Sequence, residues 1–496
     1  MPFIWNFPFF SIVIPLSCGV ICLLLEKKAA GILTFLCLTL LTAMSGMLLV
    51  FTLELGDSFT YILGHFPSPF ANEIRSGPLE ALMALLLCII NLLSVTGAKR
   101  NTEIDIPDVK KRYYYLMLNI LTGAMLAMIY TNDIFTAFVF LEISTIAVCA
   151  IILVKPGGYT MSSTIVYLVI SLISSCLILF SIAMIYGVTG HLLLPGIRSG
   201  VEALALTGEY MLPLFVFAGL ITAGLMIKSA LFPFHNWLPN AYTSATTASS
   251  SIMSGFVTKS YLFLFIKLVY RLFGMEIMGM LGIPHLLIAL GIMSIIYGSI
   301  KALGLRNSKR MLSYASIVQV GCICITIGLN TEAAMTAVIF HIIVHGIGKA
   351  LLFTAAGGLS AVSEHRNDYN YLQGAARRDP LSAAALIVGV LSLVGIPPFP
   401  GFFSKIYFTR AAIETPFAVL TIFAVIILST VLSAMYFFPL IGCIFSKAGM
   451  YPEMEKKAVP FSYKAVLIVF IVITLLLSLF SQSILGINEK GLAVFG

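Results

Sequence analysis

Apolar runs of roughly 20 residues recur along almost the whole chain, with short polar segments between them. A run of that length forms an α-helix that can cross the ~30 Å hydrocarbon core of a lipid bilayer. Hydrophobic residues make up 59% of the sequence and charged residues only 10%, which is more apolar surface than a water-soluble core can bury. The sequence therefore predicts an all-α polytopic membrane protein, with residues 1–496 forming a single transmembrane domain.

The apolar runs predict about fourteen membrane spans. They are placed near residues 3–25, 30–54, 78–98, 112–131, 133–153, 161–188, 210–231, 240–270, 279–302, 311–328, 332–359, 381–409, 415–440 and 461–484. The first run is long and no basic segment precedes it, so it is interpreted as a retained helix and not as a cleaved signal peptide.

Basic residues in the loops indicate how the spans are oriented, because lysine and arginine collect on the cytoplasmic side. If the N-terminus lies outside, most of them fall in inside loops: Lys27, Lys28, Lys99, Arg100, Lys110, Lys111, Arg112, Lys155, Lys301, Arg306, Lys309, Arg310, Arg366, Arg377, Arg378, Lys447, Lys456 and Lys457. The outside loops contain Arg75, Arg198, Arg271, Arg410 and Lys490. Both termini are therefore predicted to lie outside, and the net charge of +8 requires no nucleic-acid partner.

The nine cysteines stand singly within apolar runs, and no CxxC motif is present. We interpret them as small packing residues. The sequence therefore predicts no zinc or iron–sulfur site, and no cofactor or redox centre in this chain.

Several ionisable residues lie inside the expected spans, where a charge at the helix centre costs on the order of 2.5–3.5 kcal/mol. They are Glu142, Lys228, Lys259, His341, His345, Lys349 and Lys405. The four-residue spacing of His341, His345 and Lys349 puts them on one helix face, so we expect them to point into the protein and not into lipid.

Each of these residues also has a purely structural interpretation. A lysine near a helix end can extend its ammonium group to the membrane interface, and Glu142 can be a counter-ion without a transport role. The two neighbouring histidines can bridge helices or bind haem, although His235 and His285 are too isolated to supply a second ligand pair. Asp133 can be a helix N-cap. Several such costs within one bundle nevertheless favour a row of groups that conducts protons.

Two of the expected spans, the seventh and the twelfth, are interrupted by proline beside a lysine. The first break, KSALFPFHNWLP, contains Lys228, Pro233 and His235, and the second, GIPPFPGFFSK, contains Pro398, Pro400 and Lys405. Carbonyls released at such breaks can hold water and a cation. Lys405 is therefore interpreted as the counterpart of Lys228, and the odd offset of five spans predicts two halves of opposite orientation.

Six segments within residues 110–440 resemble, in order, the successive motifs of one membrane-protein family. They are NDIFTAFVFLEIS, LMIKSALFPFHNWLPNAY, SGFVTKSYLFLF, NSKRMLSYASIVQVG, HIIVHGIGKALLF and GIPPFPGFFSK. The family comprises the antiporter-like subunits of respiratory complex I (NADH-quinone oxidoreductase), of membrane-bound hydrogenases and of Mrp-type multisubunit sodium/proton antiporters.

The resemblance implies two inverted five-helix repeats, each with a broken helix. The expected organisation is N-terminal helices over 1–111, a first repeat over 112–270, a second over 279–440 and a C-terminal helix over 461–484. The residues assigned to ion translocation are the pair Glu142 and Lys228, the bridging Lys259, the helix with His341, His345 and Lys349, and Lys405. Asp133, Pro233, His235, Pro398 and Pro400 are assigned supporting roles.

Two functions are consistent with this resemblance. The first is a proton- or sodium-translocating subunit of a redox complex related to complex I, with the oxidoreductase chemistry in other subunits. The second is a subunit of a redox-free Mrp-type cation/proton antiporter. Either one implies a prokaryotic plasma membrane, with the lipid bilayer and other membrane subunits as partners. A carrier of an organic solute is disfavoured, because the sequence shows no polar site suited to such a substrate.

Overall fold

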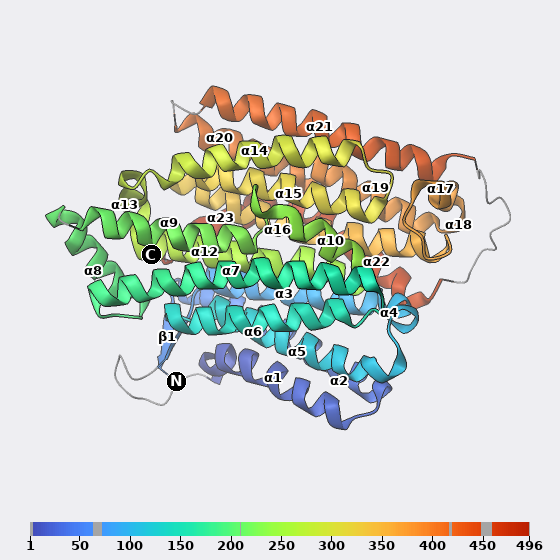
Figure 1. Ribbon diagram of the computed structural model, residues 1–496, viewed down its shortest axis with the longest axis horizontal. Helices are drawn as coiled ribbons and strands as arrows, with labels where there is room; N and C mark the ends of the chain where they lie inside the picture. The colour runs from blue at the N-terminus through green and yellow to red at the C-terminus, as the bar shows by residue number, and fades with distance from the viewer. Residues whose placement is uncertain (1–2, 63–71, 209, 416–418, 448–458, 496) are drawn as a thin grey trace.

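Long helices that run side by side dominate the computed structural model of the chain (Figure 1). The structure describes residues 3–62, 72–208, 210–415, 419–447 and 459–495. Thirteen helices in these ranges are long and apolar enough to cross a membrane. The predicted all-α polytopic fold is therefore confirmed.

The spans made of one helix are α1 (Phe7–Leu24, preceded by the 3-10 turn η1, Phe3–Asn6), α2 (Lys27–Leu55), α3 (Pro78–Gly97), α5 (Asp108–Tyr130), α6 (Ile134–Leu153), α7 (Gly158–Thr189), α9 (Met211–Lys228), α14 (Ile283–Leu303), α15 (Ser308–Ile327), α16 (Glu332–Ala361), α21 (Val419–Phe445) and α22 (Phe461–Leu479). The span Thr247–Met280 is composite: α11 (Thr247–Ile252), the π turn η4 (Met253–Val257), α12 (Thr258–Leu268), the π turn η5 (Val269–Phe273) and α13 (Gly274–Met280). Shorter helices are α4 (Lys99–Asp105), α8 (Leu194–Thr207), η3 (Phe234–Asn236), α10 (Trp237–Ser244), α17 (Tyr369–Leu372), α18 (Ala375–Arg378), α19 (Pro380–Val394), α20 (Pro400–Ile413) and α23 (Ser481–Ala493).

Two predicted spans have wrong boundaries. The span expected at 240–270 runs from Thr247 to Met280. It begins later because α10 is a separate helix that follows the break after α9. The span expected at 461–484 ends at Leu479, and α23 follows after a one-residue interruption. The span expected at 381–409 is the pair α19 and α20, which adds a broken span to the thirteen long helices.

A small hairpin was not predicted from the sequence: β1 (Phe59–Ile62) pairs antiparallel with β2 (Glu73–Ser76). The hairpin lies at the same end of the bundle as both chain ends (Figure 1). The two chain ends share one end of the bundle because the number of spans is even. The short helices α4, α17 and α18, which adjoin basic loops, lie at the opposite end, called the basic end below (Figure 1). That this end faces the cytoplasm stays a prediction. Lys456 and Lys457 lie outside the described residues.

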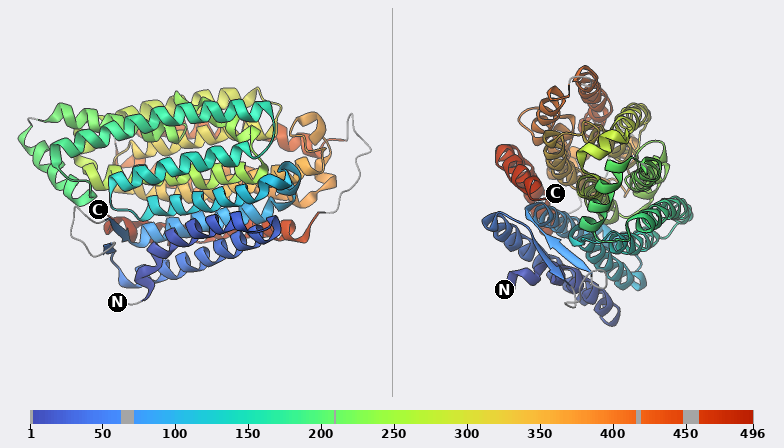
Figure 2. Two further views of the ribbon diagram at one scale, coloured as in Figure 1. Left: turned by 60° about the horizontal axis from the view of Figure 1, so that its bottom comes forward. Right: turned by 90° about the vertical axis from the view of Figure 1, so that its left-hand side faces the viewer.

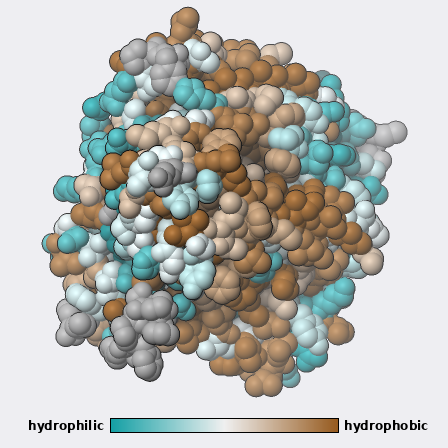
Figure 3. Space-filling model, turned by 60° about the vertical axis from the view of Figure 1, so that its left-hand side comes forward, coloured by the Kyte–Doolittle hydropathy of each residue, from teal (hydrophilic) through white to brown (hydrophobic). Residues whose placement is uncertain are grey.

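Two spans are enclosed by the others. The most apolar stretches of α16 and of the composite span Thr247–Met280 are entirely buried. Viewed along the helices, α1 and α2 lie at one edge of the bundle and α20 and α21 at the opposite edge (Figure 2). The outer helices expose large apolar side chains such as Ile165 and Phe180 of α7, and broad hydrophobic areas are visible on the surface (Figure 3). The centre is therefore shielded from lipid, as charged groups require.

The two broken spans share one backbone pattern. Ala230 and Gly395 adopt left-handed backbone, with φ of 60° and 83°. In each break the following residue, Leu231 or Ile396, donates its N–H to the carbonyl five positions earlier (3.0 and 3.1 Å). The sequence distance from Ala230 to Gly395 equals that from Leu231 to Ile396, so each residue of the first break has a counterpart at that distance in the second.

The shared pattern corrects the interpretation of Lys405 as the counterpart of Lys228. Lys228 is the last residue of α9 and precedes its break, whereas Lys405 lies within α20 and follows its break. In the register of the two breaks, Leu393 and not Lys405 matches Lys228. The proline spacing could not reveal this, because both lysines stand close to proline in the sequence.

Candidate functional site

Glu142 of α6 and Lys228 of α9 form the predicted pair, with 3.7 Å between Oε1 and Nζ. Lys228 is 1% exposed, and its Nζ also donates to Thr145 Oγ1 at 2.7 Å. Glu142 is partly buried and accepts a hydrogen bond from Ser175 Oγ. Two hydroxyl groups therefore complete a pair in which the lysine would otherwise be an uncompensated buried charge.

The end of α9 fixes the position of Lys228. A cation is favoured there by the partial negative charge of the terminal carbonyls. The helix stops because Ala230 takes left-handed backbone, which costs roughly 1–2 kcal/mol for a residue with a Cβ. Trp237 Nε1 donates to the carbonyl of Ile227 at 3.1 Å, so a carbonyl at the end of α9 gains a partner.

The π turn η4 positions Lys259. A π turn interrupts the regular pattern of helix hydrogen bonds, and such turns are frequent at functional sites. Lys259 Nζ donates to the carbonyl of Ser254, within the turn, at 2.7 Å and to Thr258 Oγ1 at 3.1 Å. Lys259 is 1% exposed, and no carboxylate among the described residues forms an ion pair with it. Its ammonium group is therefore held by neutral acceptors alone.

Two glycines let η4 and α16 approach closely. A Cβ at Gly255 would lie 2.9 Å from the carbonyl oxygen of Gly346, and a Cβ at Gly346 would lie 3.2 Å from that of Gly255. The same added Cβ at Gly346 would be 3.7 Å from Lys259 Cγ. The contact, called the glycine crossing below, therefore sets how near Lys259 lies to the charged face of α16.

Gly255→Ala is expected to lower the melting temperature of the purified protein, because its Cβ would also lie 2.9 Å from Ile90 Cγ2. Overpacking of this kind costs about 1–3 kcal/mol. Gly219→Ala in α9 is the matched control, since a Cβ there meets no atom within 4 Å. Equal melting temperatures for the two variants in thermal denaturation would contradict the close approach.

Lys349 of α16 is connected to Lys259 through two serines. Lys349 is fully buried, and its Nζ donates to the carbonyl of Leu312 in α15 at 2.9 Å. Ser316 Oγ donates to the same carbonyl at 3.2 Å and lies 3.3 Å from Ser254 Oγ. Because Ser254 also supplies the carbonyl that holds Lys259, polar contacts link the two lysines across three helices.

The two histidines continue this row toward the second broken span. His345 is fully buried, and neither ring nitrogen has a hydrogen-bond partner among the described residues. Its ring stacks on that of His341, with 5.9 Å between centroids, and His341 Nδ1 lies 2.6 Å from Ser404 Oγ of α20. Buried polar atoms without partners are uncommon in proteins, so these nitrogens favour a role beyond packing.

Lys405 follows Ser404 and ends the row. Its Nζ donates to the carbonyl of Val394, the last residue of α19, and to Thr430 Oγ1 of α21, both at 2.6 Å. The predicted neighbour, a carbonyl released by the break, is therefore present. Its stem passes Gly395, where a Cβ would lie 2.8 Å from Lys405 Cδ.

The supporting residues have structural places. Asp133 is the N-cap of α6 and accepts a hydrogen bond from Thr136 N at 2.6 Å. Pro233 precedes η3, in which the ring of His235 packs 4.6 Å from that of Tyr297. The carbonyl of Pro398 accepts a hydrogen bond from Ser478 Oγ, and Pro400 is the first residue of α20. Asp133 is therefore a helix N-cap, which is the structural role expected for it from the sequence.

Sequence reasoning missed a second buried charged cluster, near the hairpin. Lys267 is fully buried and donates to the carbonyls of Ile129 and Thr131 at the end of α5. Arg271 is also buried, and Arg75 lies 3.7 Å from Glu80. The signal was present, because Lys267 stands inside the apolar run 240–270. Arg75 and Arg271 were predicted to lie in loops, but Arg75 lies in β2 and Arg271 in the π turn η5, and both are buried.

Lys309 was likewise predicted to lie in a loop and is buried. Its Nζ donates to the carbonyl of Ala245, at the end of α10. The contact ties the start of α15 to the second half of the broken seventh span. The loop pattern could not show this, because it reports which side of the membrane a lysine is on and not how deeply it is packed.

The described residues include no group of three or more His, Cys, Asp or Glu side chains that could hold a metal ion. The groups that are brought together are acids, bases and hydroxyls, which can pass protons between them. They include the Glu142–Lys228 pair at the first broken span and the contacts of Lys405 with Val394 and Thr430 at the second.

Comparison with known proteins gives consistent matches. Residues 131–433 match the family described as "NADH:quinone oxidoreductase/Mrp antiporter, TM". The chain is 31% identical to NADH-quinone oxidoreductase subunit N of Desulforudis audaxviator, over 90% of this chain and 88% of that protein. It is 28% identical to a Na(+)/H(+) antiporter subunit of Alkalihalophilus pseudofirmus, over 71% and 69%. A chain of the archaeal membrane-bound sulfane sulfur reductase superposes with a TM-score of 0.88 at 24% identity, over 98% and 97%.

Proposed function

The chain belongs to the NADH:quinone oxidoreductase/Mrp antiporter transmembrane family, and on that premise we propose that its buried acids and bases conduct protons across the bundle. It is an antiporter-like subunit, related to subunits of complex I-type and Mrp-type complexes. Other membrane subunits are therefore its partners.

One observation carries the proposal: acids, bases and hydroxyls form a row through the interior, whereas the exterior is apolar. The row begins at Glu142 and Lys228 and passes Lys259 and Lys349. It reaches Lys405 by way of the histidines and Ser404. A structural role alone would not require several lysines without carboxylate partners in one low-dielectric interior.

The row conducts by coupling between neighbouring protonation states. Two like charges in a low-dielectric interior disfavour each other, so a proton that reaches Lys349 makes a second proton on Lys259 unfavourable. The serine link between them offers hydroxyl groups that can both donate and accept. Glu142 stabilises the charged form of Lys228. A change in the protonation of this pair therefore alters how readily the other groups of the row are protonated.

The two halves are proposed to be inverted repeats, over 112–270 and 279–440. The shared backbone pattern of the two breaks supports this division. Both termini are proposed to lie outside a prokaryotic cell membrane, because the basic loops gather at the end opposite the termini.

The relatives include subunits of NADH-quinone oxidoreductase and of Na(+)/H(+) antiporters, so two kinds of parent complex are consistent with the chain. We favour a redox complex related to complex I, and a redox-free Mrp-type cation/proton antiporter is the alternative. Affinity purification of the tagged chain from native membranes distinguishes them. Subunits with iron–sulfur or flavin absorption support the first, and their absence from an active antiporting complex supports the second. Sodium dependence of transport then separates sodium from proton movement.

His345→Ala is expected to lower proton translocation at least tenfold, with the complex still assembled. Acid–base groups commonly contribute more than this to proton transfer, and the imidazole has no described hydrogen-bond partner whose loss would unfold the site. The measurement uses a pH-sensitive dye in liposomes that contain the purified complex. His285→Ala, at an exposed position in α14, is the control. Full translocation by an assembled His341→Ala/His345→Ala variant would refute the histidine step.

A further inference from the structure

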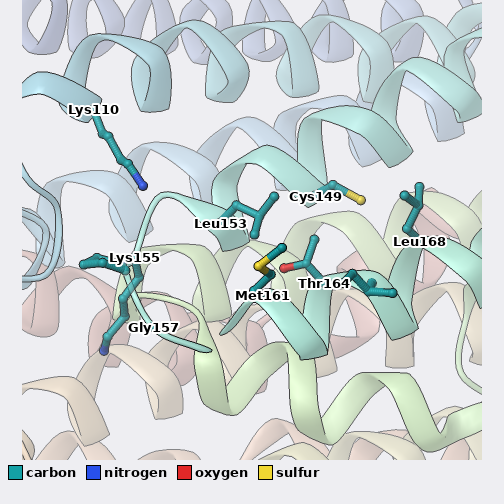
Figure 4. A pocket seen from close by; sticks show the side chains of 10 residues that line it. Lys110, Cys149, Leu153, Lys155, Gly157, Met161, Thr164 and Leu168 are labelled. Atoms are coloured by element: carbon teal, nitrogen blue, oxygen red, sulfur yellow. The ribbon is translucent and has the colours of Figure 1, made fainter. Parts of the chain in front are cut away.

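A cavity of about 440 Å³ lies at the basic end of the bundle, between the start of α5, the end of α6 and the start of α7 (Figure 4). It is separate from the row of buried acids and bases. One part of its wall is apolar and includes Leu153, Met161, Ile165 and Leu168. The other part contains two lysines, one from α5 and one from the loop between α6 and α7.

The apolar part of the cavity opens onto the outer face of α7. Met161 is 60% exposed and Ile165 51% exposed. The same helix exposes Val169, Leu172 and Ile173 further along, so an apolar surface continues from the cavity toward the middle of the membrane. A groove of this composition suits a hydrocarbon chain and not a hydrated solute.

The polar part of the cavity carries positive charge. The side chain of Lys110 points toward the cavity (Figure 4), and no carboxylate among the described residues forms an ion pair with it. Lys155 pairs with Asp105 at 3.2 Å and is 35% exposed. One acid against two lysines leaves a net positive charge at this end of the cavity.

We propose that this groove binds one anionic phospholipid, with its phosphate at Lys110, with Lys155 adding positive charge at the same end of the cavity, and with an acyl chain along the start of α7. Basic side chains at a membrane boundary attract anionic headgroups, and the exposed apolar side chains cover the chain. The two parts of the ligand match the two parts of the cavity in position and chemistry. Lipid binding does not depend on which ion the subunit moves.

Occupation of the groove affects the helices of the Glu142–Lys228 pair. Cys149, in the cavity wall, lies two turns along α6 from Glu142. Leu168 lies two turns along α7 from Ser175, which donates to Glu142. A bound chain therefore packs on both helices that hold the carboxylate. Removal of the lipid is expected to slow translocation without removing any group of the row.

The test measures binding to the purified, delipidated complex. Native mass spectrometry counts phospholipids after titration with phosphatidylglycerol or phosphatidylcholine. The wild type is expected to bind one more phosphatidylglycerol than the variant Lys110→Gln/Lys155→Gln at equal concentration, with affinity about tenfold higher. Lys28→Gln/Lys464→Gln removes the same charge from exposed positions outside the cavity and is the control.

A second variant keeps the charges and fills the groove. Ile165→Trp is expected to lose the bound lipid, whereas Ile32→Trp, at an exposed position of α2 outside the cavity, is expected to retain it. Equal lipid counts in the wild type, the lysine variant and Ile165→Trp would overturn the proposal. So would equal affinity of the wild type for the two lipids. A photo-crosslinker at Met161 that captures a neighbouring subunit and not lipid would show a protein interface instead.

Discussion

Lys405→Arg is expected to reduce ion translocation about a hundredfold or more, the range that proton-transfer groups commonly supply. Lys405 Nζ is held by the carbonyl of Val394 and by Thr430 Oγ1, both at 2.6 Å. These acceptors favour a positive charge, and arginine keeps that charge. Arginine cannot release its proton under any physiological condition, so the variant preserves the charge and removes the exchange.

The packing at Gly395 makes a second variant necessary. The stem of Lys405 already lies where a Cβ on Gly395 would be 2.8 Å away, so the larger guanidinium can also disturb the break. Lys405→Gln removes the proton-carrying group without added bulk and is expected to be equally inactive. Arg410→Lys, at an exposed position later in α20, is the control. Translocation in liposomes at the wild-type rate by Lys405→Arg would show that the position supplies only a fixed charge.

Glu142→Gln and Lys228→Met are both expected to abolish translocation, but with unequal effects on stability. Glu142→Gln leaves a lysine that is 1% exposed without its counter-ion, and breaking a buried pair in this way costs about 3–5 kcal/mol. Lys228→Met leaves Glu142, which is partly exposed and keeps Ser175 as a partner. The melting temperature should therefore fall further for the glutamate variant.

The double variant separates stability from transport. Glu142→Gln/Lys228→Met contains no unpaired buried charge, so its melting temperature should recover most of the loss caused by Glu142→Gln alone. Translocation should stay absent. A double variant as unstable as Glu142→Gln would show that the pair has no energetic coupling. Translocation by the double variant would remove the pair from the conducting row.

The spans and the buried pair could be predicted from the sequence because each depends on one strong local signal. An apolar run of about 20 residues has few folded alternatives to a membrane span. A glutamate and a lysine within such runs need compensation, and the structure places Glu142 beside Lys228.

Other features depend on tertiary packing that no local pattern reports. The π turns η4 and η5 look like ordinary helix in the sequence, yet η4 provides the carbonyl that holds Lys259. Lys267 caps the end of α5, and Lys309 contacts the end of α10. The sequence shows that both residues are lysines, but it does not show their partners, because these are backbone carbonyls and have no sequence signature. That Lys228 precedes its break and Lys405 follows its break could be seen only from the backbone conformation.

The enclosure of α16 has a consequence for the order in which the protein is made. Synthesis proceeds from the N-terminus, so α16 is complete before α20 exists. Until then His341 lacks Ser404, its hydrogen-bond partner, and two histidines and a lysine lie in a helix that is still open on one side. The glycine crossing and the contact of Lys349 with α15 join α16 to segments already made. The segments already made, α15 among them, therefore hold α16 in place until α20 is added.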